Sequence, residues 1–263
     1  MNLGGRTALV TGASGGLGQA IARALARRGA SVVLTARRAE VLEPLAAELG
    51  GRAVATDLSD RGSLERLVAD AGPVDVLVAN AGIPGSGTLD SFSVEEIDRA
   101  LDVNLRAPIL LARLLAEGMA ARGGGHMVFM SSLNGKSAPP GTPIYAATKF
   151  GLRGFAQSLR QDLEPLGIGV SAIFPGFIRD AGLFHDAGVK LPAYVRTSAP
   201  EDVGRAVVDA IEKDRAEIDV APLSVKVGTA LARLAPGPAA IVQRRLGAGE
   251  ISAQFEAGQR DKR

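Results

Sequence analysis

Tyr145 and Lys149 are four residues apart in the segment PIYAATKFG. In a helix this spacing places both side chains on one face, one turn apart. A tyrosine with its ordinary pKa of about 10 is a poor base at neutral pH, and a nearby ammonium group lowers that pKa. The pair could then exchange a proton with a substrate oxygen. Ser132 precedes Tyr145 by 13 residues and ends an apolar run, where its hydroxyl could polarise a carbonyl.

A glycine-rich segment, residues 11–18, follows the first apolar run of the chain. A turn of this kind that leads into a helix offers backbone N–H groups and the positive end of the helix dipole, which suit a pyrophosphate. Its G-x-x-x-G-x-G spacing differs from the general dinucleotide fingerprint, so a plain strand–helix turn is the alternative. The candidate phosphate-binding residues are Gly12, Ser14, Gly16, Leu17 and Gly18.

Arg37 follows the second apolar run, 25 residues after Gly12, and residues 35–38 include no Asp or Glu. An acidic residue here would hold the ribose of NAD, whereas an arginine suits the 2′-phosphate of NADP. Arginine at a helix start is mildly unfavourable against the dipole, which favours an anionic partner over a solvated cation. The segment therefore predicts NADP (NADPH) as cofactor in preference to NAD.

Short apolar runs alternate with longer segments of helical period along most of the chain. The expected strands are residues 6–11, 31–35, 52–56, 74–79, 126–131, 169–174 and 217–221. The expected helices are residues 17–28, 38–49, 60–70, 93–121, 143–166 and 200–213. Regular alternation predicts an α/β fold of three layers, a Rossmann-type doubly wound parallel sheet of about seven strands. Such a sheet binds ligands beyond the carboxyl ends of its strands.

Taken together, these motifs resemble the short-chain dehydrogenase/reductase family in order and interval. The motifs that carry the resemblance are Thr11-Gly12-x-x-x-Gly16-x-Gly18, Asn80-Ala81-Gly82, Asn104, Ser132, Tyr145-x-x-x-Lys149 and Pro175-Gly176. The resemblance spans about residues 4–221. It predicts a dinucleotide-binding and catalytic domain over residues 1–221, followed by a basic helical extension over residues 222–263.

The resemblance implies a role for each residue of the expected active site. Ser132 would orient the substrate oxygen, and Tyr145 would be the general acid/base. Lys149 would lower the tyrosine pKa and hold the nicotinamide ribose. Asn104 would support a water-linked proton relay; a polar helix residue satisfied by backbone groups is the alternative for it.

The resemblance also implies the remaining cofactor contacts. Asp57 and Leu58 would meet the adenine, and residues 80–82 would flank the cofactor. Residues 175–178 would close over the nicotinamide. The full set of expected cofactor contacts in these segments is Asp57, Leu58, Asn80, Ala81, Gly82, Pro175, Gly176 and Ile178.

Two positions depart from the family pattern. Ala79 stands where a first asparagine is common, and Asp180 stands where a threonine usually holds the nicotinamide carboxamide. An ionised Asp180 can accept from that amide but cannot donate to it, so we expect Arg179 to neutralise this carboxylate instead.

The expected function is an NADP-dependent oxidoreductase that interconverts a secondary alcohol and a carbonyl on an apolar substrate. A non-catalytic NADP-binding redox sensor is the alternative, which the intact Ser132, Tyr145 and Lys149 disfavour. The substrate side would come from residues 83–89, 133–144 and 177–194. Their candidate lining residues are Ile83, Leu133, Phe177, Leu183, Phe184, Leu191 and Tyr194.

Composition excludes several other functions. With no cysteine there is no disulfide, thiolate chemistry or cysteine-ligated metal. His126 and His185 are 59 residues apart and match no metal-binding spacing, so we expect no metal. Aromatic residues are only 4%, Trp is absent and the net charge is +2, which argues against nucleic acid as a partner. No apolar run long enough to span a membrane and no signal peptide is evident, so a cytoplasmic location is expected.

The two remaining expectations concern partners. Helices 93–121 and 143–166 should lie side by side with apolar surface to spare, and family members commonly pair through them, which predicts a homo-dimer or homo-tetramer. The seven side chains expected to provide that surface are Ala107, Leu110, Leu111, Leu114, Phe155, Leu159 and Leu163. Residues 222–263 carry a net charge of +4 and include two expected amphipathic helices, 223–235 and 239–246. We expect these helices to pack on the body or on a neighbouring subunit; a peripheral membrane contact is the less favoured alternative.

Overall fold

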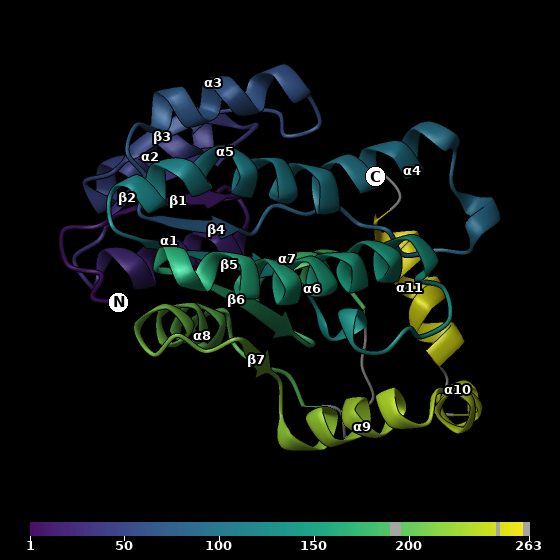
Figure 1. Ribbon diagram of the computed structural model, residues 1–263. Helices are drawn as coiled ribbons and strands as arrows, with labels where there is room; N and C mark the ends of the chain where they lie inside the picture. The colour runs from purple at the N-terminus through teal and green to yellow at the C-terminus, as the bar shows by residue number, and fades with distance from the viewer. Residues whose placement is uncertain (190–195, 246–247, 260–263) are drawn as a thin grey trace.

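The computed structural model describes residues 1–189, 196–245 and 248–259, and its centre is a seven-stranded parallel sheet (Figure 1). The strand order is β3-β2-β1-β4-β5-β6-β7. The strands are β1 (Thr7–Thr11), β2 (Ser31–Ala36), β3 (Arg52–Ala55), β4 (Val76–Ala79), β5 (Gly125–Met130), β6 (Ile168–Pro175) and β7 (Glu217–Val220). The predicted doubly wound α/β fold is confirmed.

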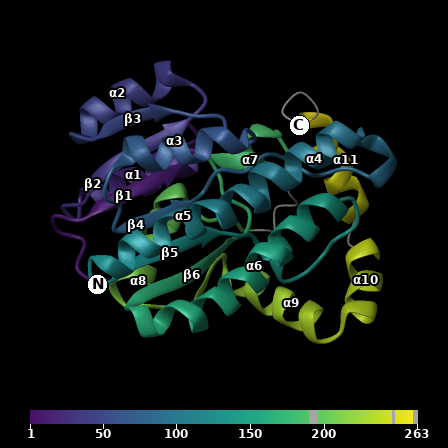
Figure 2. The same ribbon diagram turned by 45° about the horizontal axis from the view of Figure 1, so that its top comes forward.

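Helices cover both faces of the sheet. One face packs against α1 (Gly16–Ala26), α2 (Ala39–Leu49) and α8 (Pro200–Glu212). The other packs against α3 (Arg61–Ala71), α5 (Ala107–Ala121) and α6 (Pro143–Leu163). Figure 2 shows the three layers from a second direction.

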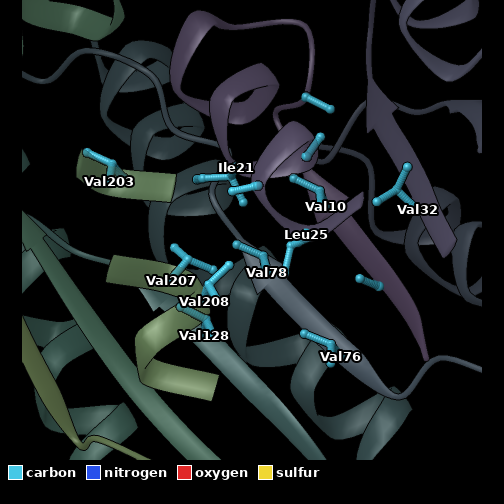
Figure 3. Close-up of a cluster of buried hydrophobic side chains, with 14 of the residues drawn as sticks. Val10, Ile21, Leu25, Val32, Val76, Val78, Val128, Val203, Val207 and Val208 are labelled. Carbon is cyan, nitrogen blue, oxygen red and sulfur yellow. The ribbon is translucent and has the colours of Figure 1, made fainter. Parts of the chain in front are cut away.

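The strands have apolar side chains on both faces because both are covered. In β1, Val10 points into the cluster under α1 and α8, while Leu9 points into the cluster under α3 and α5. Figure 3 shows the first cluster, in which Ile21 and Leu25 of α1 meet Val207 of α8 and the strand valines. This packing fixes the strands, and thereby the loops at their carboxyl ends.

The strand order reverses between β1 and β4, which pair in parallel with Leu9 opposite Leu77. The chain after β1 turns to one side of the sheet and the chain after β4 to the other, which opens a crevice between them. Ligands of doubly wound sheets bind at this topological switch point. The sheet therefore positions residues 11–18 and 80–85 as the two lips of one site.

The expected single helix over 93–121 is interrupted. It consists of α4 (Val94–Leu101), a π-helical turn over Asp102–Arg106, and α5. The π-turn contains Asn104. The expected helix 143–166 is observed as α6, followed by a short 3-10 turn. The periodicity of apolar residues does not reveal one extra residue in a turn, so the π-turn was not predicted.

Helix α6 contacts α4 and the π-turn, so the two expected helical segments do lie side by side. The predicted excess of apolar surface is only partly correct. Ala107, Leu111 and Leu163 are buried in the core of their own subunit, and the other four expected side chains are partly buried against it. The large apolar side chain that α6 does expose is Phe150.

The extension contains three helices in the described residues, one more than expected: α9 (Leu223–Leu234), α10 (Pro236–Arg245) and α11 (Ala248–Gln259). A short α7 (Gly182–Asp186) was also not expected. Figure 1 shows α9 and α10 beyond β7, and α11 returning to the body beside α7. Within the described ranges, no helix combines the length and apolar character needed to cross a bilayer.

Candidate active site

A cavity of about 1210 Å³ lies at the carboxyl ends of the strands. It brings together every predicted site residue except Asn104. The predicted residues that line it are Gly12, Ser14, Gly16, Leu17, Gly18, Arg37, Asp57, Leu58, Asn80, Ala81, Gly82, Ser132, Tyr145, Lys149, Pro175, Gly176 and Ile178. These residues come from six different strand ends, so the parallel sheet is what assembles them.

The glycine-rich turn is shaped by close backbone approaches. Gly12 has φ +66°, and a Cβ there would lie 2.7 Å from the Cα of Ala81. The helix that follows begins at Gly16, and Gly15 before it provides no side-chain cap. The first turn of α1 therefore presents backbone N–H groups and the positive dipole end to the cavity, as an anionic phosphate requires.

Thr11 and Asn80 join the two lips of the crevice. The Thr11 hydroxyl accepts from the backbone N–H groups of Asn80 at 3.0 Å and Ala81 at 2.9 Å. The Asn80 amide donates to the Thr11 carbonyl at 2.9 Å. One asparagine is thus enough to fix this turn, and Ala79 in place of the usual first asparagine is buried in the core as the last residue of β4.

Two arginines stand at the end of β2. Arg37 lines the cavity, and its charge adds to the hydrogen bonds from Ser59 that lower the pKa of Asp57 on the neighbouring loop. Arg38 also lines the cavity, and its guanidinium donates to the Ser14 backbone carbonyl and hydroxyl, both at 3.4 Å. We expected only Arg37 here. Arg38 follows Arg37 directly in the sequence, so the presence of a second cation could have been predicted. Its contact with Ser14 could not, because that contact depends on the fold.

Ser132, Tyr145 and Lys149 converge on the cavity from two elements. Ser132 follows β5, and its hydroxyl accepts from the Asn134 N–H at 3.2 Å. Tyr145 is in the first turn of α6, and its N–H donates to the Gly85 carbonyl at 3.3 Å. The ammonium of Lys149 lies 5.5 Å from the centre of the Tyr145 ring and donates to the Met130 carbonyl at 2.8 Å.

The protonation of these groups differs from the expectation. Burial raises the pKa of Tyr145 to about 12, and a hydrogen bond with Ser132 acts in the opposite direction. Burial lowers the pKa of Lys149 to about 8. Desolvation of the phenolate therefore sets the direction of the tyrosine pKa shift in this structure, and the lowering of that pKa by Lys149 stays a prediction. At neutral pH the phenol is therefore a proton donor.

Asn104 lies behind the cavity rather than in its wall. The side chain is fully buried; its Oδ1 accepts from the Ile83 N–H at 2.8 Å and its Nδ2 donates to the Ile83 carbonyl at 3.0 Å. A Cβ on Gly82 would lie 3.4 Å from Asn104 Oδ1 and 3.7 Å from Lys149 Nζ. Asn104 thus holds the loop after β4 beside Lys149, and the proton relay stays a prediction.

The segment after β6 is held by the neighbouring strand. The Gly176 N–H donates to the Val220 carbonyl at 3.0 Å, and Ile178 forms a bridge with Ser198. Asp180 has φ +64°, its side chain is 75% exposed, and Arg179 pairs with it at 3.4 Å. The expected pairing of Arg179 with Asp180 is present, and its effect on the nicotinamide carboxamide stays a prediction.

The substrate side has a wall that the sequence did not predict. Ile83, Leu133, Phe177 and Leu183 line the cavity as expected; Leu191 and Tyr194 lie outside the described residues, and the side chain of Phe184 is likewise not described. The opposite wall is formed by α9, α10 and α11. The residues they contribute include Val225, Thr229, Leu231, Ala232, Ala239, Val242, Ile251 and Phe255.

The extension is fastened to the body at several points. Val225 packs against the core cluster under α6, the Ser252 hydroxyl donates to the Pro140 carbonyl, and the Gln259 amide donates to the Leu183 carbonyl at 2.7 Å. Packing on the body is therefore seen for α11 and, through Val225, for one side of α9. For α10 it stays a prediction. The amphipathic periodicity of this segment predicted helices, but it did not predict that they would form a wall of the cavity.

Comparison with known proteins agrees with this geometry. The short chain dehydrogenase family model matches residues 6–188. The ketoacyl reductase HetN of Nostoc sp. (strain PCC 7120) is 38% identical over 227 residues, which are 83% of this chain and 79% of that protein. The 3-oxoacyl-[acyl-carrier-protein] reductase FabG of Rickettsia conorii is 35% identical over 68% of this chain and 75% of its own length.

Among solved structures, a short-chain dehydrogenase from Sphingobium yanoikuyae in complex with NADPH superposes with a TM-score of 0.77 at 28% identity, covering 89% of this chain and 94% of the other. The family match, the fold and the site geometry all support the same assignment. In that geometry, Ser132, Tyr145 and Lys149 converge on one cavity. The chain belongs to the short-chain dehydrogenase/reductase family and is an NAD(P)-dependent oxidoreductase.

Proposed function

We propose that this protein is an NADP-dependent oxidoreductase that interconverts a secondary alcohol and a carbonyl on an apolar substrate, with Tyr145 as general acid/base. The observation that carries the proposal is the shared cavity. Phosphate-binding features lie at one end, and Ser132, Tyr145 and Lys149 lie at the other. A dinucleotide that is anchored at the first end can reach the second.

The cavity suits NADP(H) in its chemistry. The uncapped first turn of α1 fits the pyrophosphate, and Arg37 and Arg38 supply two cations where the adenosine ribose would lie. Asp57 also lines the cavity, and its carboxylate accepts from the N–H and hydroxyl of Ser59 at 2.9 and 2.7 Å. NADP is favoured over NAD because the two arginines outnumber this one carboxylate.

In the reaction, the bound cofactor would supply or accept the hydride. Ser132 donates a hydrogen bond to the substrate carbonyl, which orients it and polarises it. Tyr145 transfers its phenolic proton to the developing alkoxide. Lys149 would hold the nicotinamide ribose with the ammonium that now binds Met130. A phenol that is protonated at neutral pH suits carbonyl reduction.

The substrate is proposed to be an apolar carbonyl compound. Apolar side chains make up most of both walls beyond Ser132, from Ile83 and Leu133 on the body to Val225 and Phe255 on the extension. The two relatives described above are named as a ketoacyl reductase and a 3-oxoacyl-[acyl-carrier-protein] reductase. A 3-oxoacyl thioester combines the ketone that Ser132 and Tyr145 can reduce with an acyl chain that these walls can bury, which makes it the leading candidate.

A cofactor-oxidation screen tests the proposal. NADPH consumption is measured with ketones, aldehydes, steroids and acyl thioesters, with the wild type and Tyr145→Phe in parallel. Turnover of an apolar carbonyl by the wild type alone is expected. If NADPH binds but no compound is reduced, the alternative of a redox-sensing protein is favoured instead.

A further inference from the structure

Helix α9 has three distinct sides. At 3.6 residues per turn, Leu223, Val227 and Leu234 project within about 40° of one another. Val225 and Ala232 are on the opposite side and line the cavity. Lys226 and Arg233 lie together between those two sides. One helix therefore presents a cavity wall, an apolar outer stripe and a basic flank.

The outer stripe is exposed to an extent that is unusual for such residues. Leu223 and Leu234 are both 77% exposed and Val227 is 50% exposed. Helix α10 continues the surface with Ile241, which is 49% exposed, and with Val242, which is 53% exposed and also lines the cavity. We call these five residues the outer apolar surface. A contiguous exposed apolar surface marks a site of interaction with a protein or a membrane.

The charged residues around the outer apolar surface indicate whether a protein or a membrane binds it. Residues 221–249 include no Asp or Glu, and their charged residues are Lys226, Arg233, Arg244 and Arg245. A two-fold contact with a second copy would place the same basic segment against itself, which like-charge repulsion disfavours. An anionic lipid surface satisfies both the apolar side chains and the cations.

We propose that α9 and α10 dock on an anionic lipid surface through the outer apolar surface, with Lys226 and Arg233 among the phosphate headgroups. The helices would lie in the plane of the interface. Leu231, which is 62% exposed and also lines the cavity, is at the border between the two. If the proposed function holds, an apolar substrate can then pass from the lipid past Leu231 to Ser132; the docking itself does not depend on that function.

Co-sedimentation of the full chain with vesicles tests the docking. Wild-type protein is mixed with vesicles of phosphatidylcholine alone, or of phosphatidylcholine with phosphatidylglycerol, at low salt and at physiological ionic strength. Binding is expected to the anionic vesicles and to weaken as salt rises. Leu223→Gln with Leu234→Gln should reduce the partition coefficient about tenfold or more, since each leucine buries apolar area in the interface.

Lys226→Gln with Arg233→Gln should weaken binding to a similar degree and remove most of its salt dependence. Leu166→Gln is the matched control, because Leu166 is 49% exposed but precedes β6 at the opposite end of the sheet. NADPH binding and thermal unfolding check that every variant is folded. None of these measurements depends on turnover, so failure of the docking is distinguishable from failure of the proposed function.

Three results would overturn the proposal. One is a wild type that stays in the supernatant with anionic vesicles at low salt. Another is equal sedimentation of the wild type and both double variants. The third is a protein that dimerises through this surface, so that Leu223→Gln with Leu234→Gln yields a smaller particle in light scattering while vesicle binding is absent.

Discussion

The side chain of Asn104 makes two hydrogen bonds to the backbone of Ile83, accepting from its N–H and donating to its carbonyl. A π-turn brings this buried amide to the loop that carries Gly82. Asn104→Leu should leave both Ile83 groups buried without a partner, at a cost of about 1–3 kcal/mol for each. We expect reduced thermal stability together with weaker NADPH binding.

Asn104→Asp retains hydrogen-bonding groups at this position. Burial favours the protonated form of the introduced carboxyl group, which can accept from the Ile83 N–H and donate to the Ile83 carbonyl, whereas the ionised form can only accept. Its defect in NADPH binding should therefore be smaller than that of the leucine variant. Wild-type NADPH affinity in Asn104→Leu, measured by titration, would show that Asn104 does not position this loop.

Tyr145→Phe removes the proposed proton donor and little else. Turnover of a confirmed substrate should fall by about 10²–10⁴-fold, because that is the contribution of a positioned acid or base. NADPH should bind with near wild-type affinity, since Lys149 is retained. More than a tenth of wild-type turnover would refute the role of Tyr145. Lys149→Met should impair both NADPH binding and rate.

The choice of cofactor is predicted to depend on Arg37. A charge-assisted contact with the 2′-phosphate is worth roughly 1.5–3 kcal/mol, so NADPH should bind about ten- to a hundredfold more tightly than NADH. Arg37→Ala should remove most of that preference, and Arg38→Ala a further part. Arg27→Ala, an exposed arginine just after α1, is the control. Equal dissociation constants for the two cofactors in the wild type would contradict the prediction.

Self-association is predicted through α5 and α6. Phe150 is 41% exposed on α6, where a partner can cover it. Light scattering at micromolar concentration should give twice or four times the 27.0 kDa mass of the chain. Phe150→Glu should shift the particle towards the monomer. A wild-type monomer under these conditions would count decisively against the prediction.

His126 should make stability depend on pH. The ring is buried, its Nε2 lies 2.8 Å from the Ser171 hydroxyl, and burial lowers its pKa to about 4 although Asp214 opposes the change. The unfolded chain, with a pKa near 6.5, then binds the proton more tightly. The contribution of neutral His126 to the free energy of unfolding is fully present above pH 6.5. It is lost as pH falls from 6.5 to 4, which lowers that free energy by about 3 kcal/mol.

Denaturant unfolding of the wild type and His126→Gln between pH 7.5 and 4.5 measures this effect. The variant should show a flatter profile in this window, because the contribution of Asp214, whose carboxyl pKa is lowered from 3.8 chiefly by its hydrogen bond with Arg160, is lost only at lower pH. Parallel profiles for the two proteins would show that His126 does not titrate on unfolding.

The sequence predicted most of what the sheet determines. The residue types that follow the strands, such as Gly12, Arg37 and Tyr145, were enough to predict the site. A parallel sheet brings the carboxyl ends of its strands to one edge, so these residues meet there. The π-turn at Asn104 escaped prediction because it adds a residue without changing which side chains are apolar. The direction of the Tyr145 pKa shift escaped prediction too, because burial of the phenol sets it and burial belongs to the folded chain.

Because α9 and α11 form a wall of the cavity, the residues that determine substrate range differ from those that carry out proton transfer. The reacting groups are fixed by β5 and α6, whereas much of the facing wall belongs to α9 and α11, which follow β7 in the chain. Substitutions at Val225, Ala232 or Phe255 can change which molecules are admitted and leave the proton transfer untouched. Substrate range can therefore drift during evolution, or be engineered, at positions where the chemistry imposes no constraint.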